Sequence, residues 1–421
     1  MSKYKISKFI DIVRSDEEIK LNSFLSENEI ILDEVEYINE FNELEAAEIN
    51  NINSELKLAL YENQMLVDFE CDEVSRVAQK FDDLSKGVAI LTIMPTENCN
   101  FRCLYCYENF CDFTLTSNHY DAIYGHIKQE ILSGKINHIS ILWFGGEPLL
   151  ELKDVINFTT KVRELCKAQN VDFNSSVTTN GYLLTLGTAK KLFEAGVSSA
   201  SITIDGFLHD DLRVLKNGQG TFDRVLSNIF DVLKSNVGLK IVVRCNITDA
   251  DFDFSFYDIF KEFAENDKFS IYVRAVSQWS EENIHSVKTL NKNNITSEIE
   301  KHNTYIESIG LKLNDHQTYN KPFSNVCYAA YDKGYVFRAN GDIVKCTLDL
   351  DKPLNKVGTI DPVNGAIKIL EDVNRKWTEI DLGKKCHDCS FLHRCLNKNC
   401  PLGILKGITE TNCSEYFNIN K

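Results

Sequence analysis

The sequence predicts an α/β protein: a partial barrel of six β/α units, with a small winged-helix-like domain before it and a cysteine-rich domain after it. Three observations predict this organisation. Six apolar segments alternate with amphipathic stretches between residues 87 and 277. Residues 1–85 contain one cysteine, whereas residues 321–421 contain seven. Strands that alternate with helices form a parallel sheet with right-handed crossovers.

Residues 1–85 have the pattern of a small winged-helix-like domain. The segments ISKFIDIV and EEIKLNSFL flank the polar turn Arg14–Glu17, which predicts a hairpin. Helical stretches are predicted at about 43–50 and 73–84, with LYENQMLV between them. Residues 1–90 hold 9 Lys and Arg against 21 Asp and Glu. This bias predicts either a solvated acidic face or a docking surface for a basic segment of a partner.

Residues 86–278 carry the predicted barrel. The strands are expected at 88–94, 138–143, 172–178, 198–204, 239–246 and 269–275, and the helices at 119–133, 152–169, 186–195, 222–235 and 253–265. In such folds the chemistry lies at the C-terminal ends of the strands. Residues 279–320 are polar and predict a bridging helix with loops. Residues 321–421 show little helical periodicity, so we expect metal to organise them.

The composition predicts a soluble cytoplasmic protein that binds neither nucleic acid nor a membrane. The net charge of the 421 residues is −16, whereas nucleic-acid binding needs a cationic surface. There is no apolar run of membrane length and no secretory segment at the N-terminus. In the reducing cytoplasm, the 14 cysteines are better suited to metal ligation than to disulfides.

Three cysteines follow the first barrel strand in NCNFRCLYCYE, which runs from Asn98 to Glu108. Zinc usually takes four ligands, and a disulfide takes two. Three thiolates on a [4Fe–4S] cluster leave one iron open to a small-molecule chelator. Cys99, Cys103 and Cys106 therefore favour such a cluster. The alternative is a partial zinc site or buried free cysteines.

The spacing Cys-x3-Cys-x-aromatic-Cys after the first strand resembles the radical S-adenosylmethionine (SAM) superfamily. The segments WFGGEP, TTNG and SITIDG, each at a strand end, strengthen the resemblance. It implies a radical SAM barrel with a [4Fe–4S] cluster on the three cysteines and SAM bound beside it. The residues toward SAM would then be Tyr105, Tyr107, Gly145, Gly146, Glu147, Asn180, Thr203, Asp205, Arg213 and Arg244.

The resemblance also implies roles for these residues. The GGEP segment would meet the amino group of SAM, and glycine permits that close backbone approach. Thr203 and Arg213 would hold the SAM carboxylate, because the Arg fork matches a carboxylate with two parallel hydrogen bonds. Tyr105 and Tyr107 would pack near adenine. Arg244 and Asn246, at the end of the fifth strand, are further candidates for SAM contacts.

The C-terminal cysteines resemble the SPASM domain, the auxiliary-cluster extension of radical SAM enzymes. GDIVKC is a Gly-x4-Cys motif, and CHDCSFLHRC is followed by LNKNC. The resemblance implies two auxiliary [4Fe–4S] clusters. The outer one would use Cys386, Cys389, Cys395 and Cys413, and the inner one Cys327, Cys346 and Cys400. Four residues precede Cys400 where the family usually has three, and a zinc ribbon is the alternative.

An inner cluster with three cysteine ligands has two possible completions. Either an open iron faces the substrate and takes a substrate thiolate, or a backbone, side-chain or water ligand fills the position. Some SPASM proteins have an eighth cysteine upstream of Cys327, but none lies between Cys245 and Cys327 here.

The resemblance implies that the reduced cluster cleaves SAM and that the 5′-deoxyadenosyl radical takes hydrogen from an unactivated carbon. SPASM proteins mostly act on peptides. The winged-helix-like domain resembles the recognition elements (RRE-like domains) of enzymes that modify ribosomally made peptides. Those elements capture the leader of the peptide as an added strand. We therefore expect two partners, a precursor peptide with a leader and a cysteine-containing core, and an electron donor such as flavodoxin or ferredoxin. The expected product is a cysteine thioether, as in the sactipeptide and ranthipeptide maturases.

Other activities remain open at this point. Anaerobic sulfatase-maturating enzymes usually have an Asp base directly after the Gly-x4-Cys motif, where this chain has Thr347 and then Asp349 two residues later. Peptide epimerases and carbon–carbon cross-linking enzymes share the same motifs. A non-catalytic iron–sulfur electron-transfer protein is the alternative outside enzymes. No catalytic base is assigned.

Overall fold

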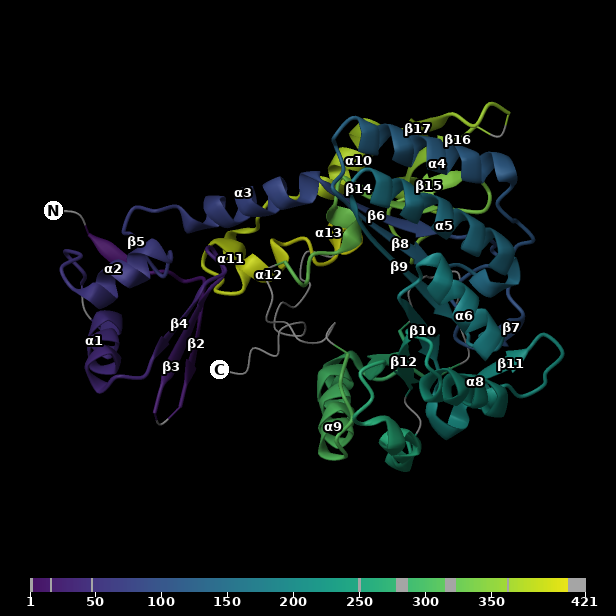
Figure 1. The fold of residues 1–421 in the computed structure, drawn as a ribbon, viewed down its shortest axis with the longest axis horizontal. Helices are drawn as coiled ribbons and strands as arrows, with labels where there is room; N and C mark the ends of the chain where they lie inside the picture. The colour runs from purple at the N-terminus through teal and green to yellow at the C-terminus, as the bar shows by residue number, and fades with distance from the viewer. Residues whose placement is uncertain are drawn as a thin grey trace. The chain divides into compact units, whose positions relative to one another are not determined.

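The computed structural model describes residues 3–15, 17–46, 48–248, 251–277, 287–314, 323–361 and 363–407 (Figure 1). The chain divides into two compact units. Unit 1 contains the described residues of Met1–Ser85, Tyr319–Cys327 and Ile380–Cys400, and unit 2 contains those of Lys86–Thr318, Tyr328–Glu379 and Pro401–Lys421. The two units are not continuous in sequence, unlike the four predicted domains (1–85, 86–278, 279–320 and 321–421), which stay a prediction.

Six parallel strands form the centre of unit 2. They are β6 (Val88–Ile93), β8 (His138–Trp143), β9 (Asp172–Thr179), β10 (Ser199–Thr203), β12 (Lys240–Ile247) and β13 (Phe269–Ala275). Each pairs in parallel with the strand that follows it in this list. Apolar side chains at alternate positions of these strands are buried, as the period of a strand requires. The predicted α/β fold with a parallel sheet is confirmed.

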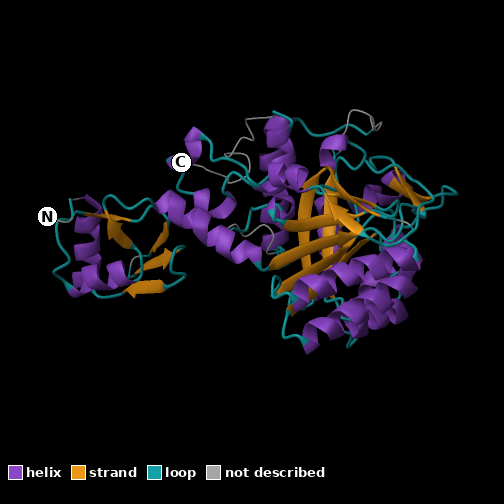
Figure 2. Ribbon diagram, turned by 90° about the horizontal axis from the view of Figure 1, so that it is seen from above, coloured by secondary structure: helices purple, strands orange, loops and turns teal. Residues whose placement is uncertain are grey.

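Helices connect these strands and are packed against the sheet, as Figure 2 shows. They are α4 (Ser117–Leu132), α5 (Leu152–Ala168), α6 (Leu186–Ala195) and α8 (Phe222–Lys234). Helix α6 begins at the N-cap Thr185, whose side chain accepts from the N–H of Thr188. It ends at Gly196, where φ is +114°, a left-handed conformation that glycine adopts readily. These four helices confirm the predictions at 119–133, 152–169, 186–195 and 222–235.

The fifth predicted helix, at 253–265, is not an α-helix. The segment η3 (Phe254–Phe263) is a 3₁₀-helix. Its side chains Phe256, Tyr257, Phe260 and Phe263 are all buried. Tertiary packing of these large rings decides the backbone here, and it overrides the α-helical preference that the spacing indicated.

The C-terminal part of unit 2 extends the same sheet. Strand β14 (Lys333–Phe337) pairs in parallel with β6. Then β15 (Asp342–Val344), β16 (Lys356–Ile360) and β17 (Ile367–Ile369) add in antiparallel order and complete a 10-stranded sheet. Paired strands therefore organise this stretch, which the sequence did not predict. The metal expected in residues 321–421 stays a prediction. Strands of three to five residues are too short to show a clear period in the sequence.

Unit 2 has further elements among its described residues. They are β7 (Phe101–Cys103), η1 (Pro148–Glu151), η2 (Gly206–Leu208), α7 (His209–Leu212), β11 (Arg213–Leu215), η4 (Lys292–Asn294), α9 (Ile295–Ser308), η6 (Tyr328–Ala330), η7 (Pro353–Asn355), α10 (Glu371–Thr378) and α13 (Pro401–Leu405). Helix α9 is the described part of the predicted bridging helix, and it contacts β13. Among the described residues, no helix is long and apolar enough to span a membrane.

The N-terminal part of unit 1 contains two small sheets. Strands β2 (Ile10–Arg14), β3 (Ile19–Ser23) and β4 (Glu29–Leu32) form an antiparallel sheet, and β1 (Tyr4–Ile6) pairs with β5 (Leu66–Asp68). The predicted hairpin is confirmed as β2 and β3. Buried apolar residues from both sheets and their helices form one core, with Leu21, Phe41, Leu60 and Met65 fully excluded from solvent.

The helices of this part differ from the prediction. Helix α1 is Val35–Ala46, so the predicted boundaries 43–50 are wrong, and α2 (Glu55–Glu62) was not predicted. Helix α3 (Glu73–Lys86) confirms the prediction at 73–84. Only Phe41 and Leu44 of α1 are buried, so its apolar pattern is weak. The description of this part as winged-helix-like stays a prediction.

The C-terminal segment of unit 1 packs against its N-terminal residues. It contains α11 (Lys384–His387) and α12 (Leu392–Cys395). The His393 ring stacks on Phe24 with a centroid distance of 3.6 Å and meets Phe9 edge-on at 5.6 Å. Main-chain bonds join residues 323–327 to the same segment, including Cys327 N to Lys398 O at 2.9 Å. Unit 1 is therefore assembled from three parts of the chain.

Candidate active site

The predicted site residues gather in one pocket of unit 2, at the carboxyl ends of the parallel strands. Its lining includes the three cysteines of the first motif and eight of the predicted SAM contacts: Tyr105, Tyr107, Gly145, Gly146, Asn180, Thr203, Arg213 and Arg244. The pocket holds about 920 Å³ of empty space, open solvent at its mouth included. Glu147 and Asp205 are buried and do not belong to this lining.

A short antiparallel pair holds the cysteine motif. Strand β7 pairs with β11 so that Cys103 lies opposite Arg213. The N–H of Phe101 donates to Cys99 Sγ at 3.4 Å. Burial raises the pKa of the Cys103 and Cys106 thiols, and it raises that of Cys99 to about 12. Bound metal would offset this cost, because a coordinating thiol is deprotonated outright.

This donor set fits an iron–sulfur cluster with three protein ligands. All three thiols line the same pocket, and thiolate is the usual ligand of such clusters. Among the residues that the structure describes, no group of three or more His, Cys, Asp or Glu side chains is placed to hold a single metal ion. A cluster differs from a single ion because its ligands bind separate iron atoms.

Glycine is required at positions 145 and 146 because this segment lies very close to residues 96–98. A Cβ atom on Gly146 would lie 2.2 Å from the carbonyl oxygen of Asn98, and one on Gly145 would lie 2.8 Å from that of Thr96. Gly145 also has φ of +99°, which favours glycine. The N–H of Glu147 donates to the Asn98 carbonyl at 2.9 Å. The glycine pair therefore lies directly against the start of the cysteine motif.

The carboxylate of Glu147 is fully buried and accepts three hydrogen bonds. Oε1 accepts from Leu149 N at 2.9 Å and Thr179 Oγ1 at 2.8 Å, and Oε2 accepts from Asn180 N at 2.8 Å. Burial raises the pKa of Glu147, and these hydrogen bonds oppose the rise. The carboxylate thus joins the WFGGEP and TTNG segments. Its predicted contact with the SAM amino group stays a prediction.

The hydroxyl of Tyr105 joins three other side chains. It donates to the Asp205 carboxylate and accepts from Arg213 Nη1 at 2.8 Å and from Asn246 Nδ2 at 2.9 Å. Burial raises the pKa of Asp205, and the positive charge of Arg213 opposes this rise. These contacts position Arg213 beside the cysteine motif.

Arg213 has a polar atom free for a ligand. Its Nε is buried and has no hydrogen-bond partner among the described residues. A buried donor without a partner costs free energy. A ligand carboxylate would accept from this N–H and match the planar fork of the guanidinium. The residues present therefore fit the carboxylate of SAM.

The remaining predicted contacts lie at neighbouring strand ends. Thr203 pairs in register with Arg244 across β10 and β12. Arg244 Nε donates to Asn246 Oδ1 at 2.8 Å, and Asn180 Nδ2 donates to Asn100 Oδ1 at 2.8 Å. The parallel sheet thus brings together side chains that the sequence separates by several β/α units.

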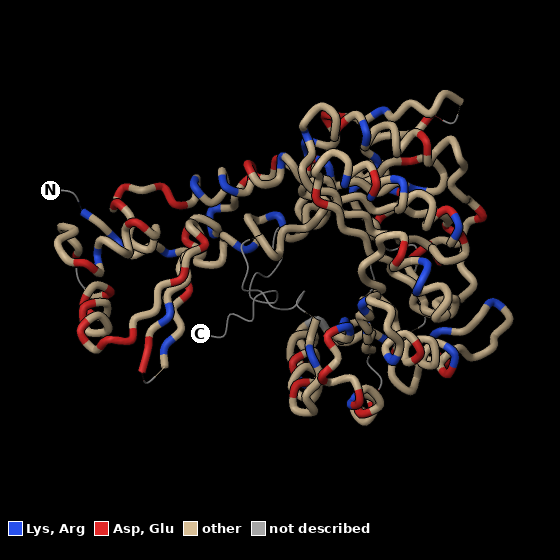
Figure 3. The backbone as a smooth tube through the Cα atoms, in the orientation of Figure 1, with Lys and Arg blue, Asp and Glu red and all other residues tan. Residues whose placement is uncertain are grey.

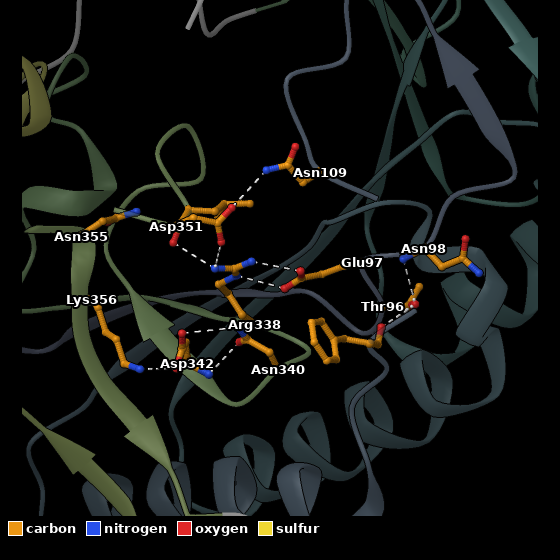
Figure 4. Close-up of polar contacts among 12 residues, drawn as sticks. Thr96, Glu97, Asn98, Asn109, Arg338, Asn340, Asp342, Asp351, Asn355 and Lys356 are labelled. Carbon is orange, nitrogen blue, oxygen red and sulfur yellow. Dashed lines mark hydrogen bonds and ion pairs between the residues drawn. The ribbon is translucent and has the colours of Figure 1, made fainter. Parts of the chain in front are cut away.

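Two acidic residues that flank the cysteine motif were not predicted. Glu108 lines the pocket, and burial together with the neighbouring charge of Glu97 raises its pKa to about 7, while Arg338 opposes the rise. Glu97 makes a buried, two-pronged ion pair with Arg338 (Figure 4). The position of Glu108 in the sequence, two residues after Cys106, was the signal that could have predicted it. No local pattern could identify the pair, because 241 residues separate Glu97 from Arg338.

The C-terminal cysteines are divided between the two units. Cys346 follows β15 in unit 2, where it is buried and its N–H donates to Asn355 Oδ1 at 2.8 Å. The other described ones belong to unit 1: Cys327, Cys386, Cys389, Cys395 and Cys400. Cys413 lies outside the described residues. The predicted inner and outer ligand sets stay predictions.

Comparison with protein families matches residues 93–256 to the Radical SAM superfamily. This span contains the cysteine motif, the WFGGEP, TTNG and SITIDG segments, and Arg213. These are the segments that form the pocket in the structure. Residues 93–256 are therefore a radical SAM domain, as the resemblance in the sequence implied.

Curated relatives match parts of the chain. The GTP 3′,8-cyclase of Aliarcobacter butzleri strain RM4018 is 34% identical over 167 residues, which cover 39% of this chain and 48% of that protein. The GTP 3′,8-cyclase of Campylobacter jejuni subsp. doylei is 32% identical over 173 residues, covering 40% and 51%. The chain thus spans about half the length of these curated relatives.

Solved structures share the fold over more of the chain. Streptococcus suis SuiB bound to the precursor peptide SuiA matches with a TM-score of 0.53 and 18% identity, over 96% of this chain and 97% of that one. Native anSMEcpe with bound AdoMet and the Cp18Cys peptide matches with a TM-score of 0.52 and 18% identity, over 73% and 88%. At this level of identity the likeness shows a common fold.

Proposed function

We propose that this chain is a SAM-dependent radical enzyme of the SPASM type that modifies a ribosomally made precursor peptide and forms cysteine thioethers. One observation carries the SAM-dependent part. Within a radical SAM domain, the three cysteines, the close-packed glycine pair and the unpaired Nε of Arg213 meet in one pocket. These are a cluster-binding loop, a backbone surface and a carboxylate-binding group.

A [4Fe–4S] cluster on the three cysteines would supply the electron that cleaves SAM to methionine and the hydrogen-abstracting radical. The residues of the chain would bind SAM and orient it. Arg213 and Thr203 would hold the SAM carboxylate, and Gly145 and Gly146 would let its amino group approach the backbone. The buried lining residues Phe101, Asn180 and Thr203 would limit access of water to the reacting atoms.

Thioether formation needs an acceptor for one electron. The acceptor carbon of the peptide loses a hydrogen atom, the cysteine thiol loses a proton, and the carbon–sulfur bond forms. One electron is left over. Two auxiliary [4Fe–4S] clusters on the C-terminal cysteines would accept it, and a flavodoxin or ferredoxin would supply the electron that starts the reaction. A cytoplasmic location suits such oxygen-sensitive groups.

The peptide part of the proposal rests on unit 1. Strand β4 is an outer strand of its sheet, and no described strand pairs with its other side. A leader peptide could add there as a further strand, with affinity from backbone hydrogen bonds. Figure 3 shows acidic residues along the N-terminal part of the chain, which would suit a Lys-rich leader. The fold shared with SuiB, which was crystallised with a precursor peptide, supports a peptide substrate.

One contact bears on a sulfatase-maturating activity. That activity would need a base near the Gly-x4-Cys motif, where Thr347 replaces the usual Asp. Asp349 Oδ2 lies 2.6 Å from Lys406 Nζ, and its side chain is 3% exposed. Lys406 is 36% exposed, so the pair is only partly buried. The positive charge of Lys406 favours the charged form of the Asp349 carboxylate and makes this carboxylate a weaker base. Peptide epimerisation, carbon–carbon cross-linking and iron–sulfur electron transfer are rival functions that the same cysteine motifs would serve.

The test uses the full chain, reconstituted anaerobically with iron and sulfide. Iron content and release of 5′-deoxyadenosine are measured with dithionite and SAM. About twelve irons per chain would fit three cubane clusters and support the proposal. About four irons would overturn the auxiliary clusters and the thioether product. Iron-loaded protein that releases no 5′-deoxyadenosine would overturn the SAM-dependent function, and stimulation of its release by GTP would favour the chemistry of the curated relatives.

A further inference from the structure

A network of ion pairs around the buried side chain of Arg338 lies beside the cysteine motif. Glu97 stands two residues before Cys99. Its two carboxylate oxygens accept from Nε and Nη2 of Arg338, each at 3.0 Å (Figure 4). The side chains of Glu97 and Arg338 are 3% and 5% exposed. The start of the motif is therefore bonded to a residue of the C-terminal extension of the sheet.

The other side of the same guanidinium reaches the end of the motif. Nη1 of Arg338 donates to Asp351 Oδ1 at 2.7 Å and to the carbonyl oxygen of Leu350 at 2.9 Å. The Asp351 side chain is 52% exposed. Its Oδ2 accepts from Asn109 Nδ2 at 3.2 Å in an exposed contact. Asn109 stands three residues after Cys106. Arg338 thus contacts one end of the cysteine loop directly and the other through a single carboxylate.

Arg338 can hold this loop because its own backbone is fixed. It follows β14, which pairs with β6, the strand that leads into the motif. Its N–H donates to Asp342 O at 2.9 Å. On the other side, Glu97 N donates to Phe113 O at 3.0 Å. The network therefore joins the loop to the regular part of the sheet, and groups bound on rigid elements keep their geometry best.

A buried ion pair of this kind contributes little to stability by itself. Replacing both charges with well-packed apolar side chains is often neutral, because each charge loses its hydration on burial. Stability alone therefore does not explain why two charges are buried here. Their geometry does suggest a reason, since a planar fork with two fixed bonds defines the position of its partner closely.

We propose that Arg338 is a positioning residue, which holds both ends of the loop that carries Cys99, Cys103 and Cys106 and so aligns the cluster ligands with bound SAM. Arg338 does not line the pocket and would touch neither SAM nor the cysteines. The inference rests on the proposed SAM-dependent function. It adds a role for the C-terminal extension of the sheet in the site of the radical SAM domain.

The test compares variants of the full chain. Arg338→Met alone would leave Glu97 buried without its partner, which can unfold the protein. The double variant Glu97→Met/Arg338→Met removes both charges and is the main test. Arg338→Lys keeps the charge but loses the fork. Arg375→Met is the matched control, because the ion pair of Arg375 with Asp372 is exposed, at 57% and 91%.

We expect the double variant to bind as much iron as the wild type but to have a raised KM for SAM. Loss of a contact that supports a metal ligand typically costs about 10- to 100-fold in metal affinity or activity. The change that SAM causes in the electron paramagnetic resonance spectrum of the reduced cluster should disappear at a SAM concentration that saturates the wild type. Amides of residues 98–111 should exchange hydrogen faster. In all three measurements, Arg338→Lys should lie between the double variant and the wild type. Arg375→Met should match the wild type.

A folded double variant with wild-type KM, spectrum and amide exchange would overturn the inference. A lowered melting temperature with those three readouts unchanged would mean a structural role only, and would overturn it as well. Failure of the proposed function has a different signature, because the wild-type protein itself would then cleave no SAM. In that case amide exchange of residues 98–111 still tests whether Arg338 holds the loop.

Discussion

Cys99, Cys103 and Cys106 line one pocket of unit 2, on a loop between the end of β6 and helix α4. Cys386, Cys389 and Cys395 lie instead in a segment of unit 1 that packs against residues from the start of the chain, through His393 on Phe24 and Phe9. The three cysteines of the pocket are positioned because the ends of successive strands meet there. The C-terminal group depends on contacts between segments more than 300 residues apart.

This difference predicts which changes each region tolerates. Changes near the N-terminus should reach the C-terminal cysteines and leave the radical SAM pocket intact, because unit 1 contains both of those segments. Changes at the strand ends of the barrel should act on the pocket alone. Three predictions test this separation, in order of decreasing expected effect on SAM cleavage.

Replacing Cys99, Cys103 and Cys106 together with alanine should abolish SAM cleavage, because no ligand for the first cluster remains. Iron bound by the C-terminal cysteines should stay. The measurements are 5′-deoxyadenosine release and iron per chain. Cys111→Ala is the control, since Cys111 does not line the pocket. Loss of all iron in the triple variant would mean that the two cysteine groups share one site.

Gly146→Ala should damage the pocket locally. The new Cβ would lie 2.2 Å from the Asn98 carbonyl, which must then move. A shift of about 1 Å in a catalytic site can cost about 100-fold in rate, and overpacking typically destabilises by about 1–3 kcal/mol. The control is Gly125→Ala, which meets no atom within 4 Å in helix α4 and should stabilise the helix by about 0.5–1 kcal/mol.

Thermal unfolding and 5′-deoxyadenosine release are measured for both glycine variants. Binding of a leader peptide to unit 1, which the proposed function expects, should not change in either. Equal activities of the two variants would contradict the close approach of Gly146 to the cysteine motif.

Phe24→Ala should weaken unit 1 and spare the pocket. Phe24 is 7% exposed and stacks on His393, so its loss leaves a cavity beside the C-terminal cysteines. Truncation of a buried Phe typically costs about 3–5 kcal/mol. Phe69→Ala, at a ring that is 54% exposed, should cost about 0.5 kcal/mol or less. Iron bound by the C-terminal cysteines should fall in the first variant alone.

Uncoupled SAM cleavage should be the same in Phe24→Ala, Phe69→Ala and the wild type. Loss of SAM cleavage in Phe24→Ala would show that the two regions are not separate in the way that the contacts indicate.

Local sequence patterns predicted the parallel strands and four of the five barrel helices. Each of these elements contains its own apolar period, and several have caps such as Thr185 and Gly196. The patterns were insufficient where packing decided the backbone. The η3 segment became a 3₁₀-helix around its buried rings, and the weakly amphipathic α1 begins earlier than predicted.

The sequence by itself determined the radical SAM motif, because its three cysteines and the glycine pair act through short spacings that a chain carries locally. Only the tertiary structure decided that residues 333–369 extend the barrel sheet and that Arg338 holds Glu97 from 241 residues away. It also decided that unit 1 is built from three distant segments. Pairing of strands and burial of charges depend on which surfaces meet in the folded chain. The hydrophobic periodicity of a short segment does not contain that information.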